Sequence, residues 1–119
     1  MTRAALECVN PRIGLVIAPT SGDAVDLPEG FAHVAGGHPV PTDGSERGGR
    51  AALALARSIR AEQRLLVLLS GGASALMAAP ADGITLADKR ATTDRLLRAG
   101  ADIHALNTVR KHVSTVKGG

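Results

Sequence analysis

Two short apolar runs, separated by a stretch patterned as a helix, constrain the fold of this chain more than any other feature. Residues Ile13–Ala18 are rich in β-branched side chains and are closed by Pro19. Leu65–Leu69 forms the second run, and both runs are typical of strands covered on both faces of a parallel sheet. Between them, good helix formers with an apolar stripe predict a helix that begins at Asp43 or Ser45. This order is the sequence form of a β-α-β crossover.

Shorter elements are predicted around these runs. Phe31–Ala35 is expected to be extended. Thr85 is a candidate N-cap for a helix that Gly100 stops, and Asp102 is a candidate N-cap for a last helix from Ile103 to about Val116. The sequence therefore predicts an α/β chain, as a partial three-layer, Rossmann-like unit with a mainly parallel sheet and flanking helices.

Composition excludes several classes of protein. Of the 119 residues 45% are apolar, but 21 are Ala, one is Phe and none is Trp or Tyr. No apolar run approaches the ~20 residues that a membrane-spanning helix needs, and the first residues lack a signal-type apolar stretch, so we expect a cytoplasmic address and no membrane partner. The single cysteine, Cys8, excludes an internal disulfide. The near-absence of aromatic side chains argues against a nucleic-acid partner.

The net charge of +3 is concentrated in the last third of the chain. From Thr85 onward there are seven basic and three acidic residues. Such an excess favours an anionic partner, either a small phosphate or carboxylate compound or a nucleic acid. The alternative is a solvated face produced by an Arg-rich composition.

A glycine-serine segment follows the second apolar run directly. It comprises Ser70, Gly71, Gly72, Ala73 and Ser74. Glycines at the carboxyl end of a parallel strand leave backbone N–H groups open, and a short helix starting at Ser74 would add positive charge for an anion. The segment is not a Walker A loop, a Gly-x-Gly-x-x-Gly fingerprint or a Gly-x-Ser-x-Gly elbow. A tight turn without a ligand is the alternative interpretation.

The last predicted helix has one polar face. Asn107, Lys111 and Ser114 lie at i, i+4 and i+7, and Arg110 lies beside them. This face is suited to phosphate or carboxylate, with Arg110 able to form a bidentate contact. A solvated amphipathic helix with cations near its C-terminus is the alternative.

The histidines do not predict a metal site. No pair of them is spaced i, i+4, and no cysteine or carboxylate completes a ligand set. His38 lies between glycines and a proline, where it could contact a ligand or brace a turn. The four histidines are His33, His38, His104 and His112.

Several stretches together resemble one family, the MOFRL-type glycerate kinases, which are glycerate 2-kinases also named hydroxypyruvate reductases. The matching stretches are Gly36–Pro41, Leu68–Leu76, Pro80–Lys89, Gly100–Ser114 and Lys117–Gly119. The family usually has glycine where this chain has Ala73. Because its members are several times longer, the resemblance implies that residues 1–119 are an internal part of the N-terminal α/β domain, without the C-terminal domain.

The resemblance also implies a function and a set of site residues. The parent enzyme would transfer the γ-phosphoryl group of ATP to the 2-hydroxyl of D-glycerate, normally with Mg²⁺. By the same resemblance, Arg110 and Lys111 would be catalytic, and a further set would bind substrate or phosphate: Ser70, Gly71, Gly72, Ser74, His38 and Asn107. Glycerate and the nucleotide would be the partners, and we expect the chain alone to be inactive and to self-associate.

Two other functions remain open at this point. Hydroxypyruvate reduction would need a dinucleotide fingerprint with a downstream acidic residue, and the sequence has none. A non-catalytic anion-binding module, or a remnant of a larger enzyme, is the other alternative.

Overall fold

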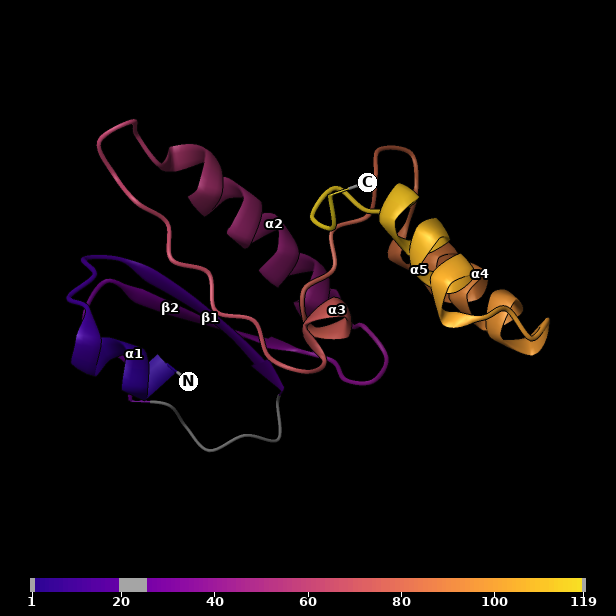
Figure 1. Ribbon diagram of the computed structural model, residues 1–119, viewed down its shortest axis with the longest axis horizontal. Coiled ribbons are helices and arrows are strands. Elements are labelled where there is room, and N and C mark those ends of the chain that lie inside the picture. Colours follow the sequence, from indigo (N-terminus) through magenta and orange to yellow (C-terminus); the bar gives the residue numbers. More distant parts are fainter. Residues whose placement is uncertain (1, 20–25, 119) are drawn as a thin grey trace.

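The computed structural model describes residues 2–19 and 26–118. It contains five helices and two strands within these residues (Figure 1). In chain order the elements are α1 (Thr2–Cys8), β1 (Gly14–Pro19), β2 (Phe31–Gly36), α2 (Asp43–Ser58), α3 (Ala73–Leu76), α4 (Leu86–Arg98) and α5 (Ile103–His112). None of the helices in these two ranges combines the length and the apolar content that crossing a bilayer requires. The helix α1, which has no buried residue, was not predicted.

The strands β1 and β2 pair in parallel, with Gly14 opposite Phe31 and Pro19 opposite Gly36. Both strands lie where the sequence predicts them, and the α/β class with a parallel sheet is confirmed. The prediction that β1 is covered on both faces is wrong, because its residues are half-buried up to the exposed Pro19. Within the described residues only one face of this two-stranded sheet carries a long helix.

That helix is α2, and glycines let it approach the sheet closely (Figure 1). A Cβ atom on Gly48 would lie 3.1 Å from Ile17 Cγ2. The predicted start at Asp43 is confirmed, and Thr42 and Ser45 form a capping box there. The fully buried Ser45 hydroxyl also accepts the Gly37 N–H at 2.9 Å, which ties α2 to the loop that follows β2.

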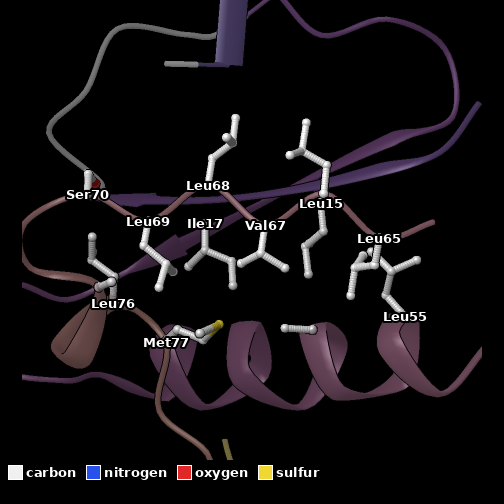
Figure 2. Close-up of a pocket in the computed structure, with 13 residues that line it drawn as sticks. Leu15, Ile17, Leu55, Leu65, Val67, Leu68, Leu69, Ser70, Leu76 and Met77 are labelled. Atoms are coloured by element: carbon white, nitrogen blue, oxygen red, sulfur yellow. The ribbon is translucent and has the colours of Figure 1, made fainter. Parts of the chain in front are cut away.

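The prediction of a buried strand at Leu65–Leu69 is wrong. The segment is extended, but within the described ranges no backbone hydrogen bond joins it to β1. Its side chains alternate as in a strand: Leu65, Val67 and Leu69 point toward α2, whereas Leu68 points away (Figure 2). Exposed fractions of 44–65%, among side chains that point toward α2 as well as in Leu68, show that the segment is not buried on either face. The predicted β-α-β crossover through α2 is therefore not completed.

The helices α4 and α5 form an antiparallel hairpin beside this layer (Figure 1). Their predicted caps are confirmed: the Thr85 side chain accepts from Asp88 N, and the Asp102 carboxylate accepts from His104 N and Ala105 N. Gly100 ends the first helix with φ of 75°.

The last helix ends at His112 rather than near Val116. Ser114 leaves the helical path because it forms an antiparallel bridge with Pro80, and its hydroxyl contacts the Ala79 carbonyl at 3.3 Å. The prediction that Ser114 shares the polar face of the helix is therefore wrong, and the serine is buried instead.

Candidate anion site

The glycine-serine segment folds into a tight turn that opens α3. Gly72 is the N-cap of this helix, with φ of 81°, and α3 begins at Ala73, one residue before the predicted start. Within the described residues, neither the Gly71 nor the Gly72 N–H donates to a protein oxygen. Because α3 has only four residues, its dipole adds little, and the charge of the site comes from side chains.

Two cations converge on Ser74. Arg110 Nη2 donates to Ser74 Oγ at 2.7 Å. Lys117 Nζ donates to the Ser74 carbonyl oxygen at 3.0 Å and also contacts Ser74 Oγ. Ion pairs in the described parts of the chain join only Arg50 to Glu46 and Arg98 to Asp94. Both cations at Ser74 thus face a hydroxyl and a carbonyl instead of a carboxylate, which leaves net positive charge for an anion.

An open pocket of about 390 Å³ lies beside this contact. Four residues of the predicted site line it together, namely Ser74, Asn107, Arg110 and Lys111, and Lys117 lies with them. The remaining lining side chains are apolar: Leu69, Ala73, Met77 and Val116. None of the lining residues among those described is a carboxylate, so a bound anion meets cations, an amide and a hydroxyl.

Burial and neighbouring charges perturb two lysines near the pocket. The pKa of Lys117 is lowered to about 8, first by burial and then by the positive charges of Arg110 and Lys89. Burial lowers the pKa of Lys89 as well, with a further contribution from Arg110. The positive charges around the pocket therefore repel one another, and a bound anion would relieve this repulsion.

Contacts between distant segments place Lys117. Thr115 N donates to the Ala79 carbonyl at 3.0 Å, and Lys89 Nζ donates to the Val113 carbonyl at 3.1 Å. These contacts hold the segment after α5 against α4 and against the residues that follow α3. They thereby place Lys117 beside Ser74. Sequence reasoning did not place Lys117 in the site. The signal that could have found it is its position in the basic last third of the chain.

The other predicted site residues lie around the turn. The His38 ring packs on Gly72, where an added Cβ would lie 2.5 Å from His38 Cδ2. The Arg90 guanidinium donates to the Pro41 carbonyl, which ties the loop of His38 to α4. Ser70 lines a neighbouring apolar pocket of about 170 Å³ beside β1 and α2 (Figure 2), and Gly71 and Gly72 are lining residues of neither pocket.

The residues of the anion pocket do not suit Mg²⁺, which prefers carboxylate and other oxygen ligands. No cluster of three or more His, Cys, Asp or Glu side chains that could hold a metal ion occurs in residues 2–19 and 26–118. The positive side chains around Ser74 would repel a divalent cation. The expected Mg²⁺ therefore finds no ligand set among the described residues.

The fold and the site together define an α/β protein with a pocket lined by cations. Residues 1–119 match the family model described as "Domain of unknown function (DUF4147)". The chain belongs to this family, and the predicted relationship to the glycerate kinases is confirmed by the relatives described next.

Curated relatives and a solved structure both relate this chain to the glycerate kinases. The D-glycerate 2-kinase of Thermotoga maritima is 37% identical over 100% of this chain and 29% of its own length. The glycerate 2-kinase of Pyrococcus horikoshii is 49% identical over 70% of this chain and 19% of its own length. The crystal structure of the Thermotoga maritima glycerate kinase matches the whole chain with a TM-score of 0.90 at 37% identity, over 29% of that structure. This chain thus spans less than a third of the relatives that it matches.

Proposed function

We propose that this chain is part of the N-terminal α/β domain of a glycerate 2-kinase, and that its pocket binds anionic oxygens during phosphoryl transfer. The substrates would be ATP and D-glycerate, with the phosphoryl group passing to the 2-hydroxyl. The observation that carries the proposal is the convergence of Arg110 and Lys117 on Ser74, in a pocket without a carboxylate among its described lining residues.

Phosphoryl transfer asks for positioning and charge neutralisation more than for covalent chemistry by the protein. Arg110 can grip a carboxylate or phosphate through two N–H groups, and Lys111 adds a second charge on the same helix. The open N–H groups of Gly71 and Gly72 can donate to a phosphate oxygen. Ser74 holds Arg110 in place, and Asn107 can orient a substrate hydroxyl.

The relatives and the sequence favour this function over hydroxypyruvate reduction. Two relatives from Agrobacterium vitis, 36% and 39% identical over 98% of the chain, carry a provisional hydroxypyruvate reductase name. A nicotinamide enzyme would need a glycine fingerprint and an acidic residue for the ribose, and neither occurs in the sequence. We therefore propose the kinase activity for the protein.

A segment exchange tests the proposal. The corresponding 29% of the Thermotoga maritima kinase is replaced by this chain, and glycerate-dependent formation of ADP from ATP is measured. An active exchange protein is expected, and Arg110→Ala in it should lower kcat/KM by roughly 10- to 100-fold through loss of a charge-assisted contact.

The matched control is Arg95→Ala, because Arg95 is an exposed arginine of α4 outside the pocket. It should leave kcat/KM unchanged. Equal turnover of the Arg110→Ala and Arg95→Ala proteins would contradict the proposed role. Phosphate binding by a catalytically silent exchange protein would instead favour the non-catalytic anion-binding module.

A further inference from the structure

Lys117 has a chemistry that anion binding does not use. We propose that Lys117 is a nucleophilic amine, and that this pocket forms a covalent imine with small aldehydes or 2-oxo acids that also carry a phosphate or a carboxylate. The inference needs the pocket but does not depend on phosphoryl transfer.

The hydrogen bonds of Lys117 suit a neutral amine. A neutral amine has two N–H donors and one lone pair, and Ser74 offers two acceptors, its carbonyl oxygen at 3.0 Å and its hydroxyl. Both donors can be used at once, so the lone pair stays available to a molecule in the pocket. An ammonium group would have a third N–H, and no described carboxylate is placed to accept it.

Among the described residues, the charged groups that face Lys117 are all positive. Arg110 and Lys111 project from α5 into the same pocket, and Lys89 adds its charge from α4. Burial lowers the pKa of Lys117 from an ordinary 10.5 to about 8, with further contributions from the charges of Arg110 and Lys89. A lysine desolvated beside other cations is the arrangement that enzymes use to activate an amine nucleophile near neutral pH.

The same cations select the electrophile. The planar Arg110 guanidinium can hold the phosphate or carboxylate through two N–H groups while the carbonyl group reaches Lys117. The pocket of about 390 Å³ has room for a small organic anion. Binding beside the amine raises the effective concentration of the carbonyl, as in other oriented reactions.

Formation of the imine needs neither an oxidant nor a reductant. The Lys117 lone pair adds to the carbonyl carbon, and the oxygen takes up the proton that the nitrogen gives up, which yields a carbinolamine. The carbinolamine then loses one water, and the carbon–nitrogen double bond forms. The product is a reversible imine, and the only other product is water.

Reductive labelling of the 119-residue chain tests the proposal. The chain is incubated with pyridoxal 5′-phosphate, reduced with borohydride, digested and mapped by mass spectrometry. Lys117 should be labelled roughly tenfold faster than Lys111, which lines the same pocket but is exposed, because the lowered pKa of Lys117 leaves part of its amine neutral at pH 7.5. The labelling rate of Lys117 should rise with pH and level off above about 8.

Further controls separate the contributions of the phosphate, of Arg110 and of Lys117 to the labelling. Pyridoxal without its phosphate should label Lys117 several-fold more slowly, and Arg110→Ala should remove that difference. Glyoxylate replaces the phosphate by a carboxylate and should compete with the labelling. Lys117→Arg should abolish the main site, and labelling of the unaltered chain carries the test even if this variant fails to fold. Equal labelling of Lys117 and Lys111, or no effect of the phosphate, would overturn the proposal.

Discussion

At the scale of single residues, Gly72 and Lys117 fix the geometry and the charge of the site. Gly72 has a positive φ and lies under the His38 ring, so the turn before Ser74 depends on a residue without a side chain. Lys117 brings a partly neutral amine to the same serine. Each feature arises from one residue, and each can be changed alone.

Replacing Gly72 with alanine should destabilise the turn. The substitution forces a side chain into the left-handed region and places a Cβ 2.5 Å from His38 Cδ2, which costs about 1–3 kcal/mol. Gly71→Ala is the matched control, because nothing lies within 4 Å of its Cβ position and its φ is not positive. Urea unfolding of both variants checks this, and equal midpoints would show that the turn does not need glycine at position 72.

The stability of the chain should depend on pH through Lys117. Its pKa falls from 10.5 to about 8 on folding, so between these values the unfolded chain binds more protons and the free energy of unfolding rises with pH. Well below pH 8 the contribution is constant, because the amine is then almost fully protonated in both states. The effect is modest, since Lys117 is only half-buried and solvent screens its charge.

Urea unfolding at pH 7.5 and pH 10 measures this contribution. Lys117→Met should reduce the gain in stability across that interval, whereas Lys111→Met, at an exposed position, is the comparison. A gain that is the same in the unaltered chain and in Lys117→Met would show that the amine is already fully solvated in the folded chain.

At the scale of elements, α5 carries three of the pocket side chains, and its first turn depends on Asp102. This carboxylate accepts from His104 N at 2.8 Å and from Ala105 N at 2.9 Å. Asn107, Arg110 and Lys111 follow within three turns of this cap. The cap thus links the stability of the helix to the shape of the pocket.

Removing the cap should lower both the stability of α5 and the affinity of the pocket for phosphate. Asp102→Ala is expected to cost about 1 kcal/mol of unfolding free energy and to lower the affinity for phosphate several-fold. Asp102→Asn should retain most of the stability, because asparagine is an equally good N-cap. Circular dichroism during urea unfolding, with a phosphate titration, tests this; an Asn variant as unstable as the Ala variant would contradict the capping role.

Local signals explain which elements the sequence could predict. The strands β1 and β2, the start of α2, and the caps at Thr85 and Asp102 are set by neighbouring residues, and they lie where expected. Leu65–Leu69 could not be predicted in the same way, because a strand exists only through a hydrogen-bonded partner, and its apolar pattern does not supply one. The end of α5 and the place of Lys117 depend on contacts with Ala79 and Pro80, more than 30 residues away in the sequence.

At the scale of the whole molecule, the described residues form two parts joined around α3 (Figure 1). The sheet and α2 form one part, the α4–α5 hairpin forms the other, and the pocket lies between α3 and α5. Of the predicted site, Ser74, Asn107, Arg110 and Lys111 share this pocket. Ser70, Gly71, Gly72 and His38 are not among its lining residues, and Ser70 lines the neighbouring apolar pocket instead.

The exposed Leu65–Leu69 segment should make the chain associate. Large apolar side chains in an extended segment without a hydrogen-bonded partner favour pairing between copies. Leu68→Lys, at a side chain that points away from α2 (Figure 2), should shift the chain toward monomer in sedimentation velocity. Leu97→Lys is the control, since Leu97 is 58% exposed but lies on α4; a chain that is monomeric at all concentrations would contradict this expectation.

Phosphate titration followed residue by residue tests whether the turn at Ser74, the cations of α5 and Lys117 form one anion site. In ¹H–¹⁵N spectra of the chain, inorganic phosphate should shift the amides of Gly71, Gly72, Ser74 and Lys117 together, along one binding curve, and Arg110→Ala should weaken that curve roughly tenfold. Shifts confined to other parts of the chain, or a curve that Arg110→Ala leaves unchanged, would contradict the account.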